Sequence, residues 1–135
     1  MPKSAYSGLM RPPLTPITWV GSSRADLKAA PAEVQDVVGL ALLQAQLGGV
    51  APQAKRLKGD LSGLVEIVAD VASGTYRAVY TAKLAGRLYV LHVFQKKATR
   101  GIATPKHEVE LIKQRLRWAR WHHAQLAAGR SPLEG

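Results

Sequence analysis

Three consecutive segments of the chain have the residue pattern of β-strands and are separated by turns too short to hold another element. Residues 64–71 alternate between apolar and polar side chains, residues 75–82 present two distinct faces, and residues 87–94 are apolar nearly throughout. Ser73-Gly74 and Ala85-Gly86 supply the turns between them. Short turns connect antiparallel neighbours, so the sequence predicts a meander in which residues 87–94 form a central strand.

Residues outside the meander add one strand and three helices to the predicted fold. Residues 17–20 form a short β-prone run, residues 22–30 a brief helix, and residues 31–47 a longer helix with proline at its first position. Thr104-Pro105 begins the last helix as cap and first residue. The predicted order is β-α-α-β-β-β-α. This order indicates an α+β domain with its helices packed on one face of a small antiparallel sheet.

The helix over residues 31–47 carries two apolar stripes. One face holds Val34, Val37, Val38, Ala41 and Ala45, and the opposite face holds Leu40, Leu43 and Leu47. Two stripes indicate burial on both sides, either inside the domain or partly against another chain. Burial inside the domain is the favoured alternative, because most apolar helix faces are covered within their own fold.

Length and composition favour one folded domain of 135 residues. We expect residues 1–16, which contain four prolines, to be a flexible leader, residues 17–128 to form the domain, and residues 129–135 to be a flexible tail. The chain has no cysteine, no apolar run of the roughly 18–20 residues that a membrane span needs, and no signal-peptide core. These features predict a cytoplasmic protein without a membrane partner.

Positive charge is concentrated in the second part of the chain. The net charge is +10, with four basic and three acidic residues in residues 1–54 but fifteen and six in residues 55–135. A basic domain of this kind suggests RNA, DNA, a ribosomal surface or an acidic protein as its partner, although a soluble basic protein without such a ligand is the simpler alternative.

The motifs of the common catalytic and metal sites are absent from the sequence, and we predict neither a metal nor a cofactor. His122 and His123 are neighbours on a helix, so they diverge by about 100° and cannot share one metal ion. His92 lies within a strand and is expected to be a hydrogen-bonded core residue rather than a base. We also expect Tyr76, Tyr80 and Tyr89 to pack in the core, with stacking on a base as the alternative.

Cationic side chains are expected to converge where the third strand of the meander ends. If residues 75–82 and 87–94 pair, Arg77 lies roughly opposite residues 95–97, which include Lys96 and Lys97, and Arg100 follows shortly after. Such a cluster can cleave RNA without a metal, because the 2′-hydroxyl of RNA is itself a nucleophile. A clustered lysine has a lowered pKa and can transfer a proton, whereas an arginine clamps phosphate. The alternative is a strand end that its lysines merely keep soluble.

The segment from Leu57 to Ala119 resembles the RelE/HigB-like toxins of bacterial type II toxin–antitoxin systems, and in particular their phage-derived HigB-like branch. The most specific motif is F-x-K-K followed by T-P, present here as Phe94-Gln-Lys96-Lys97 and Thr104-Pro105. The resemblance extends over about residues 17–120 and implies a RelE-like fold. It further implies a ribosome-dependent endonuclease that cleaves mRNA and inhibits translation. An antitoxin, commonly a helix-turn-helix protein through which the complex can bind operator DNA, would neutralise the toxin.

The resemblance assigns the catalytic role to Arg77, Lys96 and Lys97, while Glu66 matches a family glutamate whose role could equally be structural. The arginine that often follows this glutamate is absent, since the chain reads Glu66-Ile-Val. No tyrosine follows the lysine pair, and His107 is the nearest titratable aromatic residue. We expect further RNA contacts from Lys83, Arg87, Arg100, Lys113 and Arg117.

Two other functions fit the same sequence. One is a gyrase-inhibiting ParE-like toxin, a binding module with this fold, and the other is a phage-derived protein without toxicity. Trp118 and Trp121 lie away from the core stripe of the last helix, so its outer face is a candidate antitoxin surface. Packing of these tryptophans against the rest of the domain is the alternative.

Overall fold

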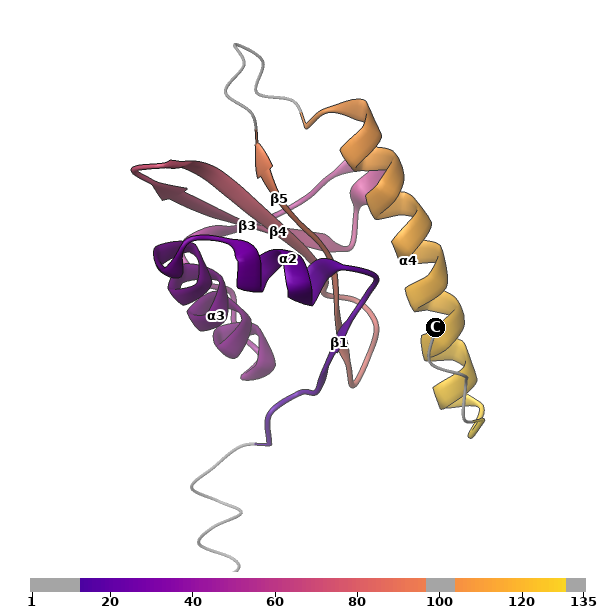
Figure 1. The fold of residues 1–135 in the computed structure, drawn as a ribbon. Coiled ribbons are helices and arrows are strands. Elements are labelled where there is room, and N and C mark those ends of the chain that lie inside the picture. The colour runs from indigo at the N-terminus through magenta and orange to yellow at the C-terminus, as the bar shows by residue number, and fades with distance from the viewer. Residues whose placement is uncertain (1–12, 97–103, 131–135) are drawn as a thin grey trace, which may run out of the picture.

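The computed structural model describes residues 13–96 and 104–130 (Figure 1). The elements in chain order are β1 (Ile17–Trp19), α2 (Ser23–Ala29), α3 (Ala32–Gln46), β2 (Ala54–Arg56), the 3₁₀ turn η1 (Gly59–Leu61), β3 (Leu64–Val71), β4 (Gly74–Thr81), β5 (Leu88–Lys96) and α4 (Lys106–Ala127). The predicted α+β class and the predicted meander, which is β3–β4–β5, are confirmed. No helix among the described residues is long and apolar enough to cross a membrane.

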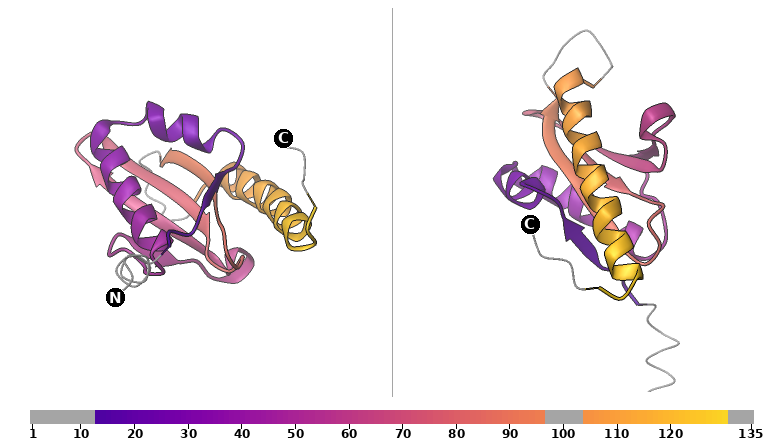
Figure 2. Two further views of the ribbon diagram at one scale, coloured as in Figure 1. Left: turned by 90° about the horizontal axis from the view of Figure 1, so that it is seen from below. Right: turned by 90° about the vertical axis from the view of Figure 1, so that its right-hand side faces the viewer.

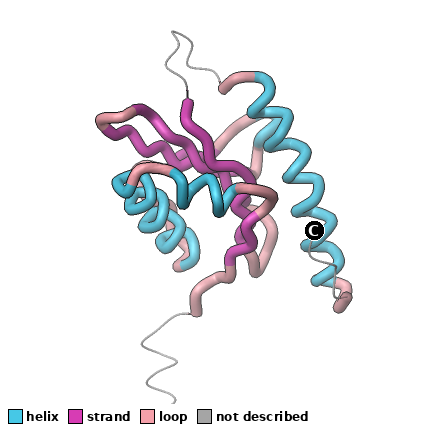
Figure 3. Tube along the Cα trace, in the orientation of Figure 1, coloured by secondary structure: helices cyan, strands magenta, loops and turns pink. Residues whose placement is uncertain are grey.

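The sheet has five strands in the order β1-β5-β4-β3-β2. Figure 3 shows the strands in magenta and the helices beside them in cyan. Strands β2 to β5 pair in antiparallel fashion, but β1 runs parallel to β5, with Ile17 opposite Leu88 and Trp19 opposite Val90. The prediction of a purely antiparallel sheet is therefore wrong for one edge strand. A long connection through three intervening strands and two helices allows β1 to join β5 in the parallel direction. Strand β2 was not predicted, because it is three residues long and two of them are charged and exposed.

The helices cover both faces of the sheet, not one face as predicted (Figure 2). On one face, α3 packs through Val34 and Val38 against a core that includes Ile67 of β3. On the other face, α4 packs through Ile112 and Leu116 against a second core. The physical reason is that β5 is buried on both of its faces from Leu88 to Phe94, and each face needs its own cover.

The second apolar stripe of α3 is not covered by the domain. Leu40, Leu43 and Leu47 have exposed fractions of 66%, 40% and 50%, whereas Val34, Val38, Ala41, Leu42 and Ala45 are buried. The favoured alternative, burial of both stripes inside the domain, is thus wrong for the leucine stripe. This stripe, defined here as Leu40, Leu43 and Leu47, is left as an apolar surface that a partner chain can cover.

A β-bulge in β5 determines which side chains of that strand face α4. Val79 pairs with His92 and Tyr80 pairs with Val90, so Leu91 is an extra residue between them. Beyond the bulge, Arg77 pairs with Phe94 and Thr75 pairs with Lys96. Cross-strand partners point to the same face, so Arg77, Phe94 and Lys96 all lie on the face covered by α4. The sequence predicted residues 95–97 as the partners of Arg77, which is one to three residues beyond the observed partner, Phe94.

Candidate functional site

The candidate site lies on the α4 face of the sheet, at the end where β5 finishes. Four adjacent strands each contribute one charged side chain, namely Lys55 from β2, Glu66 from β3, Arg77 from β4 and Lys96 from β5. Lys55 pairs directly with Glu66, and the alternation along each strand places these four side chains on one face. The cluster has three positive charges and one negative charge, so it is suited to binding an anion.

A buried ion pair forms the centre of this cluster. The Nη1 atom of Arg77 donates to Oε1 of Glu66 at 2.7 Å, and the two side chains are only 13% and 4% exposed. The Nζ atom of Lys55 lies 3.6 Å from the same oxygen, with its side chain largely in solvent. The carboxylate fixes the guanidinium on the sheet, because the pairing of β3 with β4 places Glu66 and Arg77 on the same face.

The Nε atom of Arg77 is buried and has no hydrogen-bond partner among the described residues. A buried donor without a partner is costly, so such a group calls for an explanation in ligand binding or function. Glu66 holds the guanidinium through Nη1, and 13% of the Arg77 side chain remains exposed at the sheet surface. Arg77 is therefore held in place and can still contact a phosphate oxygen through its exposed part.

Lys96 interacts electrostatically with the rest of the cluster. Desolvation near the sheet lowers the pKa of Lys96, and the positive charges of Arg77 and Lys55 lower it further, while the negative charge of Glu66 opposes this shift. The structure thus brings Arg77 and Lys96 together, as predicted from the sequence. A lysine with a lowered pKa is better able to exchange a proton near neutral pH than an ordinary surface lysine.

The other predicted RNA contacts are dispersed. Lys97 and Arg100 lie outside the described residues. Arg87 precedes β5 at the end far from Lys96 and donates to Oγ1 of Thr18 at 2.9 Å. Lys113 of α4 forms an ion pair with Asp60 of η1, with Nζ of the lysine 3.2 Å from Oδ2 of the aspartate. Lys83 lies in the turn after β4, and Arg117 is exposed on α4, so neither joins Arg77 and Lys96.

A network next to the cluster confirms His92 as a hydrogen-bonded core residue, although its partners were not predicted from the sequence. His92 is buried, its Nε2 atom lies 2.9 Å from Oε1 of Glu108, and its Nδ1 atom lies 3.3 Å from Nη1 of Arg115. The His92 ring stacks on Phe94 at a centroid distance of 4.7 Å. The network ties the end of β5 to the first turn of α4. The sequence placed Glu108 in that turn, but the bulge that turns His92 toward it left no recognisable signal.

Glu108→Ala is expected to lower the free energy of unfolding by about 1–3 kcal/mol, because the buried His92 ring loses its carboxylate partner. Glu110→Ala, on the exposed side of the same helix, is the matched control and is expected to change stability by no more than about 0.5 kcal/mol. Urea unfolding followed by circular dichroism measures both values. Equal stability of the two variants would contradict the stabilising role of the network.

Two further histidines and two tyrosines of the described residues have structural partners. Nδ1 of His122 lies 2.8 Å from the hydroxyl of Tyr89, whereas Nε2 of His123 lies 2.8 Å from the carbonyl oxygen of Ala85, so the two rings have separate partners. Tyr80 and Tyr89 are buried in the two cores, which confirms the expected core packing. Within residues 13–96 and 104–130, no group of three or more histidine and acidic side chains is placed to hold a metal ion.

Comparison with known proteins identifies a family. The family described as phage-derived protein Gp49-like matches residues 25–117, which is more than half of the chain and includes the whole candidate site. No curated protein matches the chain. Among solved structures, a chain of the toxin–antitoxin complex RelBE2 from Mycobacterium tuberculosis is similar, with 21% identity, coverage of 61% of this chain and 98% of that chain, and a TM-score of 0.43. The chain belongs to the family of phage-derived Gp49-like proteins, a family of RelE/HigB-type toxins.

Proposed function

We propose that the protein is a toxin that cleaves mRNA on the ribosome and thereby inhibits translation in the cytoplasm. The observation that carries this proposal is the arrangement of Arg77 and Lys96 beside the buried carboxylate of Glu66 on one sheet face. Membership in a family of RelE/HigB-type toxins supports the toxin class. The cleavage activity itself rests on the chemistry that this cluster can perform.

The proposed reaction uses the 2′-hydroxyl of the substrate as its nucleophile. Its oxygen attacks the adjacent phosphorus and its proton passes to a base. The bond from phosphorus to the 5′-oxygen breaks as that oxygen takes up a proton from an acid, leaving a 2′,3′-cyclic phosphate and a 5′-hydroxyl. Arg77 is placed to stabilise the negative charge that builds up on the phosphate oxygens. Lys96, with its lowered pKa, is the candidate for proton transfer, and Lys97 is proposed to assist at the same place.

We propose that a cognate antitoxin, of the helix-turn-helix class, neutralises the protein and carries the complex to operator DNA. Two apolar surfaces are available to such a partner. One is the leucine stripe of α3, and the other is α4 around Trp121, which is 47% exposed. Trp118 is less available than the sequence suggested, because it packs against the core under α4 and stacks on His122.

The proposed function is tested by inducing the protein without an antitoxin and mapping mRNA ends by primer extension. We expect growth arrest and new 5′ ends within translated reading frames, and their loss when translation initiation is blocked. Accumulation of gyrase–DNA cleavage complexes with intact mRNA would instead identify a ParE-like toxin. Unimpaired growth at high expression levels would show that the protein is not toxic and would overturn the proposal.

A further inference from the structure

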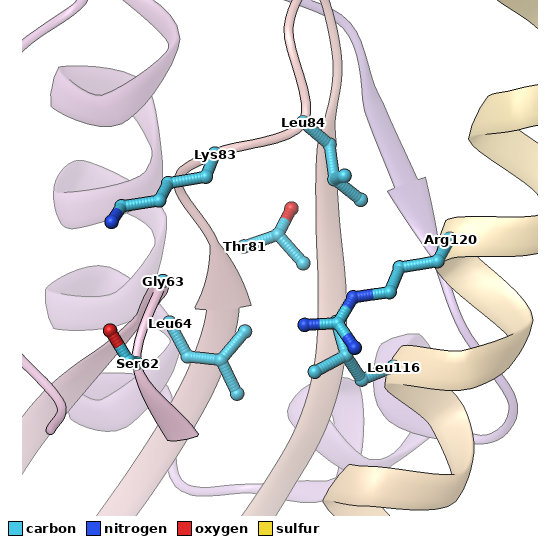
Figure 4. Close-up of a pocket in the computed structure, with 8 residues that line it drawn as sticks. All are labelled: Ser62, Gly63, Leu64, Thr81, Lys83, Leu84, Leu116 and Arg120. Atoms are coloured by element: carbon cyan, nitrogen blue, oxygen red, sulfur yellow. The ribbon is translucent and has the colours of Figure 1, made fainter. Parts of the chain in front are cut away.

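A second cationic feature lies on the same face of the sheet, away from the Arg77–Lys96 cluster. It is a recess of about 200 Å³ between α4 and the paired ends of β3 and β4. Leu64, Thr81 and Leu116 are its buried residues, and Ser62, Lys83 and Arg120 lie around them (Figure 4). We refer to this feature as the Arg120 recess.

The cations of the Arg120 recess have no acidic partners within the part of the chain that the structure describes. Neither Arg120 nor Lys83 forms a hydrogen bond or an ion pair with another described residue, and no carboxylate lines the recess. Figure 4 shows the Arg120 guanidinium extending from α4 over Leu64 and Leu116. Arg56 lines a separate cavity with Ser62, Gly63 and Lys83, and its strand partner Val65 belongs to the core on the other sheet face. Cations gathered around a concave site without counter-charges favour an anionic ligand.

Local backbone geometry places a hydroxyl and a lysine stem at the rim. Gly63 has φ +95°, and a Cβ atom at that position would lie 3.5 Å from Cδ of Lys83, so the lysine stem passes directly over the glycine. The Lys83 ammonium points away from Arg120 in Figure 4, on the side of Gly63 where the Ser62 hydroxyl lies. Because the Lys83 side chain is exposed and has a flexible four-carbon stem, its ammonium can reach an anion held by Arg120.

The position of the recess relates it to the candidate active site. Thr81 follows Arg77 by four residues on β4, and both side chains point to the α4 face. At about 3.3 Å per residue this separation is about 13 Å along the sheet. A nucleic-acid strand carries a phosphate at every nucleotide, so one strand can contact both places.

We propose that the Arg120 recess binds a backbone phosphate of the RNA strand whose scissile phosphate lies at Arg77 and Lys96. This inference rests on the proposed function, and it assigns to Arg120 and Lys83 the role of positioning the substrate. Arg120 clamps the phosphate oxygens, Lys83 adds a movable charge, and the Ser62 hydroxyl can donate a hydrogen bond. Recognition of this kind reads the RNA backbone and not its base sequence.

Binding is tested with the full chain and a labelled ten-nucleotide RNA whose riboses carry 2′-O-methyl groups, so that it cannot be cleaved. Arg120→Gln is expected to weaken the affinity about tenfold, as for the loss of one charge-assisted contact, and Lys83→Gln with Arg120→Gln is expected to weaken it further. Each lost phosphate contact is expected to reduce the slope of log affinity against log salt by about 0.7. Both side chains are exposed, so the variants should fold normally.

Arg24→Gln provides the matched control, because it removes one exposed positive charge from α2, whose Leu27 packs into the core on the other sheet face. We expect it to retain the affinity of the unaltered protein for RNA. If the Lys83 and Arg120 double variant binds RNA as tightly as Arg24→Gln, the inference is wrong. The inference is also wrong if Lys83 and Arg120 are required for binding an oligo-glutamate peptide but not for binding RNA.

A second measurement separates this inference from the proposed function. Titration with inorganic phosphate, followed by ¹⁵N spectra, is expected to shift the Gly63 amide and the Arg120 Nε signals in the unaltered protein but not the Gly63 signal in Arg120→Gln. Retained cleavage with no dependence on Arg120 would contradict the inference and leave the proposed function intact. Absence of cleavage together with these phosphate shifts would contradict the proposed function and leave an anion site at the recess.

Discussion

The variant that combines Lys96→Ala with Lys97→Ala loses toxicity, and its mRNA cleavage rate falls by about 10²–10⁴-fold, as expected when a proton-transferring group is removed. Lys96 is the residue of the pair that the structure places in the cluster with Arg77 and Glu66. The loss is measured as the cleavage rate in a reconstituted translation reaction and as colony formation after induction. A double variant that remained fully toxic would falsify the assignment of the site.

The fold is expected to survive this change, because Lys96 ends β5 at the partly exposed edge of the site and contributes little to either core. The thermal midpoint of the variant should therefore stay close to that of the unaltered protein. Lys28→Ala, an exposed replacement on α2, controls for the loss of positive charge and should keep full toxicity. Loss of toxicity in this control would point to general electrostatic attraction of RNA and away from a specific site.

The pH dependence of cleavage distinguishes the two roles open to Lys96. Because the pKa of Lys96 is lowered, its titration should appear in the rate profile below the pH at which an ordinary lysine titrates. If Lys96 acts as a base, its neutral amine is the active form, and the cleavage rate rises with pH up to that pKa. If Lys96 acts as an acid, its ammonium is the active form, and the cleavage rate falls above that pKa. Lys96→Arg stays charged throughout and should remove this limb, whereas an unchanged profile would exclude proton transfer by Lys96.

The alternating strands allowed the sequence to predict much of this site. One face of β3 and one face of β4 carry only apolar side chains, including Ile67 and Ala78, so both faces are expected to be buried against the same core. Glu66 and Arg77 then necessarily share the other face. The pattern of apolar and polar residues is sufficient for this inference. The same pattern explains why the strand predicted at residues 64–71 has the bounds of β3.

Strand β5 explains why the rest could not be predicted. Its residues are apolar on both faces, so the sequence carries no period from which to locate the bulge at Leu91. Without the bulge, neither the pairing of Arg77 with Phe94 nor the contact of His92 with Glu108 can be placed. The same uniform burial does indicate that helices must cover both faces, and the prediction of a single covered face overlooked this signal. Strand β1 has only three residues, too few to show its direction.

Arg77→Ala is expected to reduce cleavage by about 10²–10³-fold, as for removal of one group that stabilises developing charge. It should also destabilise the protein, because removing one partner of a buried ion pair costs about 3–5 kcal/mol. Lys55, 3.6 Å from the Glu66 carboxylate, offsets part of this cost. Loss of activity in the single variant alone therefore does not separate catalysis from folding.

The double variant Glu66→Leu with Arg77→Leu makes that separation. Replacing both buried partners by apolar side chains is often neutral or stabilising, so we expect this protein to unfold at a urea concentration at least as high as Arg77→Ala does. Glu66→Gln, which keeps the arginine and a hydrogen-bond acceptor, should retain most of the cleavage activity, because the guanidinium remains on the sheet. A stable double variant that still cleaves mRNA at the normal rate would show that the Glu66–Arg77 pair is structural only. A stable but inactive double variant, set beside an active Glu66→Gln, would assign the chemical contribution to the guanidinium.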